Sequence, residues 1–252
     1  MKSQATMYKD GWNLSDKEDQ PLIIRLKRAF HEKRLIFSLI CSIKNKLKFL
    51  TIQIAHHLFT FSIDGIKYRY FTHKYNAVNG ERTVELPWVL SLLDSGKTIL
   101  EIGNVLSHYV NIPHTIVDKY EMSPGVINKD AEYFRTDTKY DFIVTISTLE
   151  HIGYDEEIKD PFKIQRVIEN LKSLIKGGGK MIITVPLVYN PAIDEIIKNN
   201  SQSFSKKIFM KRISTFNLWK QCAMDEAMKL TYGSKYPFAN SVAFLVFEKQ
   251  HT

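Results

Sequence analysis

Short apolar runs alternate with helical stretches over the second half of the chain, and this alternation constrains the fold more than any other feature. Five runs are typical of buried strands, at residues 98–102, 114–118, 141–147, 180–186 and 242–247. Strands that are joined by helices pair in parallel, and a parallel sheet needs helices over both faces. The sequence therefore predicts an α/β domain with a Rossmann-like sheet.

One helix in this alternation has clear ends. Asp160 is a capping residue, Pro161 is tolerated in a first helical turn, and Gly177 is a common stop. Between them, apolar residues recur three or four positions apart, as one face of a helix requires. They are Ile164, Ile168, Leu171 and Ile175. The spacing predicts a helix over 161–176.

The first 80 residues have a different character. Apolar residues recur at helical spacing over 21–54, and the first 50 residues hold 11 Lys and Arg against 5 Asp and Glu. Two short β-like runs over 58–71 flank Asp64-Gly65, a pair suited to a hairpin turn. Asn79-Gly80 is a typical boundary. We predict an appendage of helix and hairpin over 1–80, followed by the main domain over 81–252.

The basic helix has several possible partners. Its longest apolar run, 35–43, is far shorter than the ~20 residues that span a bilayer. The helix either covers the main domain or makes peripheral contact with an anionic membrane through 21–54. Nucleic acid is a weaker alternative, because the basic excess is confined to this segment. Two cysteines without metal-ligand spacing and the lack of a secretory leader favour a cytoplasmic protein, with the inner membrane surface as its peripheral site.

Residues at predicted strand ends indicate a nucleotide-like ligand. In open α/β sheets, ligands bind beyond the carboxyl ends of the strands. Gly103 follows the first strand and permits close approach of the backbone to a ligand. Glu101 either orders this turn or meets a cationic amino group, and Asp118 ends the next strand, where a carboxylate can accept from two ribose hydroxyls.

Five segments in order resemble the motifs of class I S-adenosylmethionine-dependent methyltransferases. They are LEIG (100–103), IVDKY (116–120), NKDAEYF (128–134), YDFIVTISTLEHIG (140–153) and LIKGGGKMIITVPL (174–187). The resemblance implies a seven-stranded, mostly parallel sheet whose last strand is antiparallel. It also implies S-adenosylmethionine as cofactor.

The resemblance assigns roles to particular residues. Glu101 and Gly103 would lie at the methionine part of the cofactor, and Asp118 would bind the ribose. Asn104 and Lys119, which follow Gly103 and Asp118, are further candidates for cofactor binding. Asp130 and Ala131 would flank the adenine, and Ser147 and Leu149 would line the methyl-transfer face. One departure is clear: the family's turn carries three alternate glycines, whereas Val105 and Ser107 replace the second and third here. Val105 and Ser107 require a turn with ordinary negative φ, which predicts a cofactor pose different from the family's.

Glu150 and His151 are the candidate catalytic residues. A histidine titrates near neutral pH, and a neighbouring glutamate can orient it or share its proton. A structural role is the alternative for both residues, and positioning alone can suffice for methyl transfer. No additional ligand at a convincing spacing suggests a metal.

The sequence predicts transfer of a methyl group to an O or N acceptor, with a small molecule or sugar favoured. A fold that has lost its cofactor and serves as an accessory protein is the main alternative. An RNA methyltransferase is a third reading, which the nearly balanced charge of the main domain weakens. A nicotinamide-dependent oxidoreductase is disfavoured because GxGxxG is missing.

Overall fold

The computed structural model describes residues 35–73, 75–94, 96–199 and 204–251; side chains are described from residue 42 on, except at 75 and 76. The chain divides into two compact units, 1–50 and 51–252. The predicted basic segment 21–34 lies outside the described residues. The sequence-based boundary near residue 80 stays a prediction.

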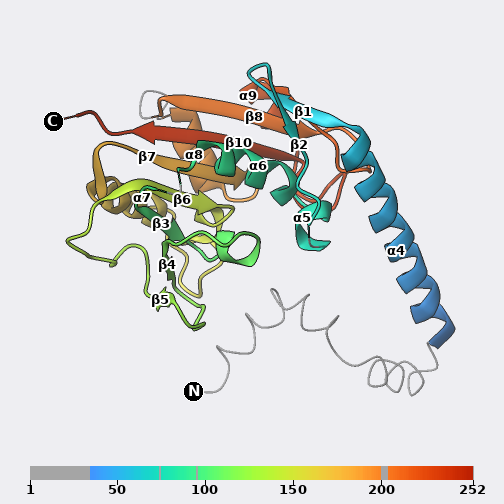
Figure 1. Cartoon of the computed structure of the whole chain (residues 1–252), viewed down its shortest axis with the longest axis horizontal. Helices are drawn as coiled ribbons and strands as arrows, with labels where there is room; N and C mark the ends of the chain where they lie inside the picture. The colour runs from blue at the N-terminus through green and yellow to red at the C-terminus, as the bar shows by residue number, and fades with distance from the viewer. Residues whose placement is uncertain (1–34, 74, 95, 200–203, 252) are drawn as a thin grey trace. The chain divides into compact units, whose positions relative to one another are not determined.

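The second unit is built on one eight-stranded sheet in the order β5-β4-β3-β6-β7-β10-β8-β9 (Figure 1). The strands are β3 (Ile99–Ile102), β4 (Thr115–Asp118), β5 (Val126–Asn128), β6 (Tyr140–Ile146), β7 (Ile175–Pro186), β8 (Lys206–Arg212), β9 (Trp219–Cys222) and β10 (Ser241–Glu248). The five neighbouring strands β5, β4, β3, β6 and β7 pair in parallel, and β10 lies antiparallel between β7 and β8. The α/β fold with a mostly parallel sheet is confirmed.

The expected number of seven strands is wrong, because β9 adds an eighth at the sheet edge, antiparallel to β8. Contacts distant in sequence hold β9 there. The Tyr70 hydroxyl accepts a hydrogen bond from the Trp219 amide at 2.9 Å. The Gln221 side chain donates to Asp64 Oδ1 at 2.9 Å and accepts from the Asp64 amide at 2.8 Å. Such tertiary contacts carry no local sequence signal.

Alternation along the central strands sends side chains into two cores, one on each face of the sheet. On β7, Ile183 joins one core and Ile182 joins the other. Neighbouring β10 divides in the same way, with Leu245 on one side and Phe244 on the other. Strands buried on both faces read as continuous apolar runs, which explains why the sequence identified them.

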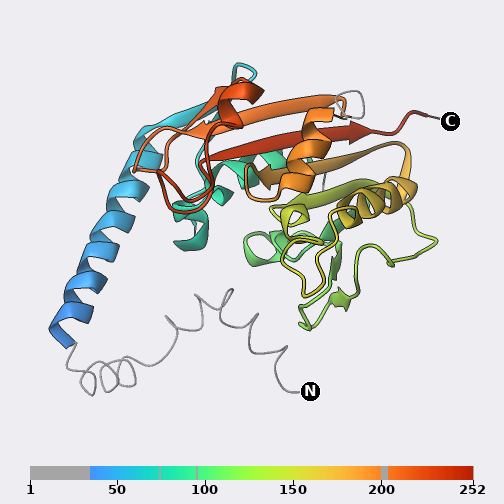
Figure 2. The same cartoon turned by 180° about the vertical axis from the view of Figure 1, so that it is seen from behind.

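Helices cover both faces, as expected. On one face lies α6 (Arg82–Leu92), whose Trp88 stacks on Phe244 with ring centroids 4.7 Å apart. On the other lie α7 (Lys163–Ser173) and α8 (Pro191–Asn199) (Figure 2). The short helices α5 (Tyr75–Asn79) and α9 (Met224–Ala227) complete the α-helices of the described second unit.

The predicted helix 161–176 is shorter in the structure. It ends at Ser173, and Ile175 already begins β7. A register shift of β7 against β6 takes up the glycine run. A Cβ on Gly179 would lie 2.9 Å from the carbonyl oxygen of Asp141, so glycine is needed where these two backbones approach. Gly177 therefore belongs to a strand irregularity and does not end the helix.

The predicted hairpin is confirmed as β1 (Thr60–Ile63) and β2 (Ile66–Arg69) around Asp64 and Gly65, which have φ of 49° and 81°. Two consecutive residues with positive φ match the twist of paired strands. Phe61 and Ile63 enter the core that contains Trp88, so the hairpin packs with the sheet.

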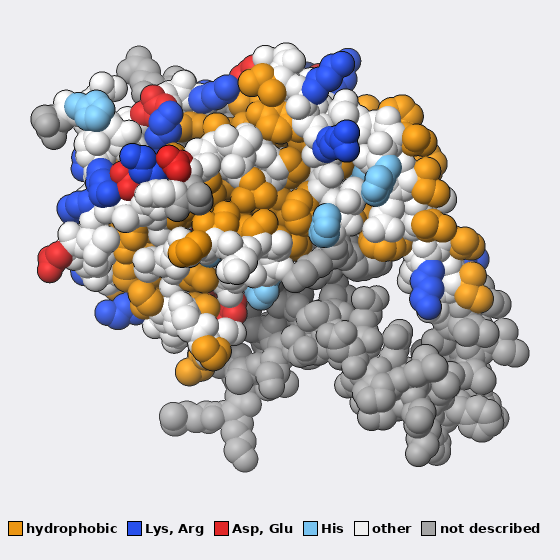
Figure 3. All heavy atoms as spheres, viewed as in Figure 1, with side chains coloured by type: hydrophobic (Ala, Val, Ile, Leu, Met, Phe, Trp, Pro, Cys, Tyr) orange, Lys and Arg blue, Asp and Glu red, His pale blue; other side chains and the backbone are white. Residues whose placement is uncertain are grey.

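The helix α4 (Leu35–Leu58) confirms helical structure over the described part of the basic segment. One stripe of it exposes large apolar side chains, which are orange in Figure 3: Ile43, Leu47, Leu50, Ile54 and Leu58. Among the described residues, no helix combines the length and apolar character needed to cross a membrane.

Candidate functional site

The turn after β3 is built around Gly103, which has φ of 83°. A Cβ here would lie 2.9 Å from Thr148 Cγ2 and closer still to its Oγ1. Both the backbone conformation and the close approach of the segment after β6 therefore require glycine. This turn brings the ends of β3 and β6 together at one edge of the sheet.

Glu101 is fully buried and holds the turn that follows. Its Oε1 accepts hydrogen bonds from the amides of Val105 at 3.0 Å and Leu106 at 2.8 Å. Its Oε2 lies 2.8 Å from Nε2 of His114, and this hydrogen bond raises the pKa of the histidine. Of the two roles predicted for Glu101, the structure shows the ordering of the turn.

These contacts explain how a turn without the second and third glycines keeps its shape. The Glu101 carboxylate accepts hydrogen bonds from the amides of Val105 and Leu106, and His114 holds the other carboxylate oxygen in place. The sequence reading missed His114. The alternation of strands and helices also predicts a helix between Gly103 and Asp118, because one helix and one strand fit this spacing. The structure has only a single 3-10 turn there, Leu106–His108, and an irregular return to β4.

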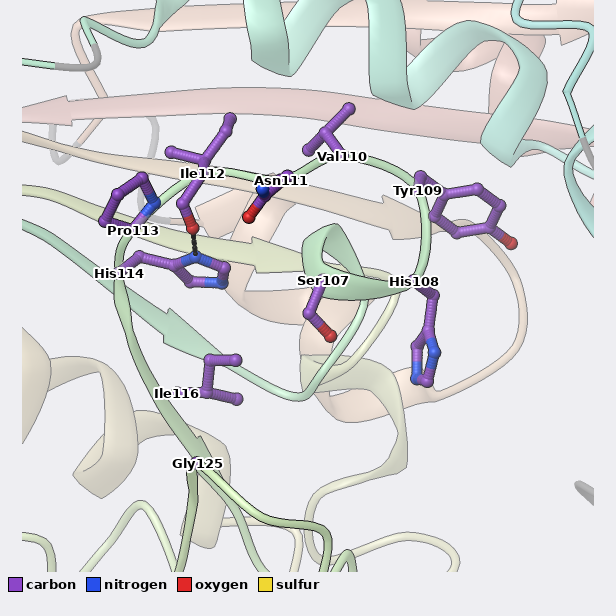
Figure 4. A pocket seen from close by; sticks show the side chains of 10 residues that line it. All are labelled: Ser107, His108, Tyr109, Val110, Asn111, Ile112, Pro113, His114, Ile116 and Gly125. Atoms are coloured by element: carbon purple, nitrogen blue, oxygen red, sulfur yellow. Dashed lines mark hydrogen bonds between the residues drawn. The ribbon is translucent and has the colours of Figure 1, made fainter.

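That return segment leaves a hollow of about 540 Å³ beside β4 (Figure 4). Its lining is apolar at Val110, Ile112, Pro113 and Ile116, with His108 and His114 beside them. None of the predicted site residues lines it. The hollow and the predicted site are therefore different features.

Asp118 lies at the carboxyl end of β4, as predicted. Its Oδ1 accepts hydrogen bonds from the amides of Tyr120 at 2.7 Å and Glu121 at 2.8 Å. None of the hydrogen bonds found among the described residues involves its Oδ2. The Asn104 side chain donates to Glu121 Oε1 at 2.8 Å, which ties the turn after β3 to the loop after β4. One face of Asp118 thus shapes the loop while one oxygen remains available to a ligand.

An ion cluster formed by Lys119, Asp130, Glu156 and Lys163 borders this edge. Lys119 Nζ lies 2.7 Å from Glu156 and 3.1 Å from Asp130. Lys163 Nζ lies 2.6 Å from Asp130 and 2.7 Å from Glu156. Burial opposes ionisation of Asp130, but its hydrogen bonds with the lysines prevail and its pKa is lowered. The sequence reading had identified Lys119 and Asp130 and missed the other two.

Ala131 follows this cluster and is buried. Its carbonyl accepts a hydrogen bond from Asn170 on α7 at 2.8 Å. The Ala131 side chain belongs to the core that contains Leu100 and Val117, and the Asp130 carboxylate is engaged by two lysines.

Ser147, Leu149 and Glu150 come directly after β6 and are all buried. Ser147 has φ of 39°, and its hydroxyl donates to Glu85 Oε1 on α6 at 2.6 Å. The Glu150 carbonyl accepts from Asn190 Nδ2 at 2.8 Å. Its carboxylate Oε2 has no hydrogen-bond partner. Burial, followed by the charge of nearby Glu85, raises the pKa of Glu150 well above its usual range.

His151 is better placed for proton transfer than its neighbour. Its Nδ1 makes a short hydrogen bond with Asp155 Oδ2, and its Nε2 lies 3.6 Å from Glu150 Oε1. The Tyr189 hydroxyl donates to the same Asp155 oxygen at 2.7 Å. About a third of the imidazole side chain is exposed. An aspartate that is hydrogen-bonded to one ring nitrogen fixes the orientation of a histidine, which suits a general base.

The structure therefore brings the predicted residues to the carboxyl edge of β3, β4 and β6 and adds Asp155, Glu85 and Tyr189. Among the described residues, no group of His, Cys, Asp and Glu is arranged to hold a metal ion. An open α/β sheet with acids and a glycine turn at this edge is typical of Rossmann-like folds.

No protein-family model matches the chain, and comparison with curated proteins finds no match. Among solved structures, similar chains include the N-methyltransferase NodS from Bradyrhizobium japonicum, with 11% identity over 65% of this chain and 93% of that one and a TM-score of 0.40. Another is a possible histamine N-methyltransferase from Thermotoga maritima, with 16% identity, coverage of 66% and 88%, and a TM-score of 0.39. A methyltransferase from Methanosarcina mazei has 13% identity, coverage of 66% and 98%, and a TM-score of 0.38.

Proposed function

We propose that this protein binds S-adenosylmethionine at the carboxyl edge of β3 and β4 and transfers its methyl group to a small-molecule or sugar acceptor. The observation that carries the proposal is the alignment of Gly103 and Asp118 at one sheet edge. The glycine turn closes against Thr148, and the aspartate ends the neighbouring strand with one oxygen uncommitted.

The residues fit this cofactor. Asp118 Oδ2 can accept from the ribose hydroxyls, Gly103 and Asn104 can border the methionine part, and Asp130-Ala131 can border the adenine. Lys119 would act through the ion cluster, since its ammonium is already paired with two carboxylates. Glu101 supports the site by holding the turn. Bound S-adenosylmethionine supplies an electrophilic methyl group on a sulfonium.

The catalytic contribution of the chain itself comes from the segment after β6. Ser147 and Leu149 shape the floor beside the cofactor, while Glu150 and His151 receive the proton that the acceptor gives up. His151 holds that proton with Asp155 as its partner on the opposite nitrogen. Neighbouring carboxylates, those of Glu85 and Glu150, repel one another when both are ionised, so a proton is favoured on one of them.

Calorimetric titration with S-adenosylmethionine and S-adenosylhomocysteine tests the proposal. Asp118→Ala removes the acceptor of the ribose hydroxyls. Loss of one hydrogen bond to a charged group costs about 1.5–3 kcal/mol, so the variant should weaken binding about 10- to 100-fold. Asp137→Ala, in a loop away from this edge, is the matched control and should bind normally. Failure of the wild-type chain to bind either compound would favour the accessory-protein alternative.

We also propose that the exposed stripe of α4 makes peripheral contact with an anionic membrane. The exposed Lys44, Lys46 and Lys48 accompany Ile43 and Leu47 on this helix, and such a combination suits an interfacial site. Stronger sedimentation with anionic than with neutral liposomes would support the contact, and equal sedimentation would argue against it.

A further inference from the structure

Three glutamates from different parts of the chain bring carboxylates together beneath the surface. Glu81 immediately precedes α6, Glu85 lies in its first turn, and Glu150 follows β6; we call them the buried acidic cluster. Each carboxylate oxygen of Glu85 has a hydrogen-bond donor: Ser147 donates to one at 2.6 Å and Arg82 to the other at 2.9 Å. Glu81 Oε2 and Glu150 Oε2 are buried and have no partner.

The other oxygen of Glu150, Oε1, lies 3.6 Å from His151 Nε2, so the deficit concerns the two Oε2 atoms. A buried carboxylate oxygen without a donor is unfavourable, because burial removes its hydration and no hydrogen bond replaces it. Burial, and then the charge of Glu85, raises the pKa of both Glu81 and Glu150. Arg82 is the guanidinium bonded to the cluster through Glu85. Arg212 also interacts with Glu81, although burial lowers the pKa of this arginine to about 10. The two orphaned oxygens still lack donors.

The surroundings of the cluster favour an organic cation over a metal ion. Its carboxylates do not form a metal-holding group within the described residues. Aromatic rings lie beside it instead: the ring of Tyr189 meets that of His151, the neighbour of Glu150, edge to face with centroids 5.3 Å apart. Burial, and then the charges of Glu81 and Glu150, raise the pKa of Tyr232. The rings of these two tyrosines meet edge to face with centroids 4.9 Å apart. Carboxylates with aromatic rings recognise substituted ammonium groups.

We propose that the acceptor is an amine, which enters as an ammonium cation and donates hydrogen bonds to the orphaned oxygens of Glu81 and Glu150. This inference rests on the proposed function, because it names the substrate class of the same site. A hydroxyl acceptor has one O–H donor and no charge, so it can satisfy only one of the two oxygens, whereas an ammonium has up to three N–H donors and a positive charge that favours the ionised carboxylates.

Protons move in two steps. Binding of the cation favours the ionised carboxylates, so Glu81 and Glu150 release protons to solvent as the ammonium docks. The ammonium nitrogen has no lone pair, so one N–H bond then breaks heterolytically, its electron pair stays on nitrogen, and its proton passes to Glu150 or His151. The other charged groups around the cluster, Arg82, Arg212 and Asp155, keep their partners.

Calorimetry on the full chain can test this without turnover. The probes are benzylamine and glucosamine, each compared with its hydroxyl counterpart, benzyl alcohol or glucose, up to about 10 mM. We expect at least one amine to bind about tenfold more tightly than its alcohol. Titration in buffers of different ionisation enthalpy should show proton release with the amine. Equal binding of amine and alcohol, binding without proton release, or no binding of either amine would overturn the inference.

Variants separate recognition from folding. Glu150→Gln and Glu81→Gln replace the acids by neutral groups of the same shape and should each weaken amine binding about tenfold or more. Glu169→Gln, on the exposed side of α7, is the control and should leave amine binding unchanged. Undiminished amine binding in both cluster variants would contradict the inference. A parallel titration with S-adenosylhomocysteine distinguishes failure of this inference from failure of the proposed function. If S-adenosylhomocysteine binds and neither amine binds, only the acceptor class is rejected. If S-adenosylhomocysteine does not bind, the proposed function is rejected.

Discussion

Replacement of Gly103 by alanine gives the sharpest test of the turn that carries the site. Two separate penalties are expected. The φ of 83° is unfavourable for a residue with a Cβ, by about 1–2 kcal/mol. The new methyl group would also lie 2.9 Å from Thr148 Cγ2, and overpacking of this kind costs about 1–3 kcal/mol. Together, Gly103→Ala should lower the free energy of unfolding by about 2–5 kcal/mol.

The two penalties can be separated by matched variants. Gly65 has a φ of 81°, and no atom lies within 4 Å of the position that a Cβ would occupy there, so Gly65→Ala should show the conformational penalty alone. Thr148→Ala removes the atoms that crowd the new methyl and leaves a Cβ at 3.2 Å, which small shifts can accommodate. In the Thr148→Ala background, Gly103→Ala should therefore cost only about 1–2 kcal/mol.

Urea unfolding of the four proteins of this double-mutant cycle measures the coupling directly. The expected result is a coupling free energy of about 1–3 kcal/mol between the two positions. If Gly103→Ala destabilises no more than Gly65→Ala, or if the two substitutions are additive, the close approach of the β3 turn to Thr148 does not constrain the site as described.

Two further predictions concern the charged groups. Because the pKa of Glu150 is raised above its ordinary 4.5, the folded protein retains a proton that the unfolded chain loses, so stability falls as the pH rises from 4.5 through the raised folded value. Glu150→Gln should flatten this dependence in urea unfolding between pH 5 and 8, and parallel profiles for variant and wild type would contradict the assignment. Lys163→Met should lower the thermal midpoint more than Lys119→Met, because the Lys163 side chain is 8% exposed and that of Lys119 is 35% exposed; equal effects would show that the ion cluster is screened throughout.

Part of the fold was predictable because its signals are local. The strands β3, β4, β6, β7 and β10 are continuous apolar runs, and the Asp64-Gly65 hairpin has its own turn chemistry. The short β5 and the edge strand β9 were missed, since three or four residues carry too little periodicity to stand out. The strand β8 was missed as well, because its apolar run is only three residues long, Ile208 to Met210, between basic residues. The helix expected between Gly103 and Asp118 was wrong because the Glu101 carboxylate, anchored by His114, stabilises an irregular turn instead.

The site shows the same division. Strand-end residues such as Gly103, Asp118 and His151 could be placed from the sequence, because the carboxyl ends of parallel strands share one edge. Their assigned roles remain predictions. Asp155 carries a local signal, as an acid four residues after His151 that can either shape an acceptor pocket or belong to a plain loop. Glu85 carries no such signal, since it meets Ser147 from a helix 62 positions earlier in the chain.

The sequence by itself determined an alternating α/β sheet and the set of polar residues at its carboxyl edge, because both follow from the spacing of apolar residues along the chain. Only the tertiary structure decided that Glu85 and Glu150 are buried and that the Oε2 atoms of Glu81 and Glu150 are enclosed without a hydrogen-bond partner. Burial removes water from a carboxyl group and so changes its pKa and its need for a hydrogen-bond donor. This burial depends on the packing of α6 against the sheet, which involves residues from the whole chain.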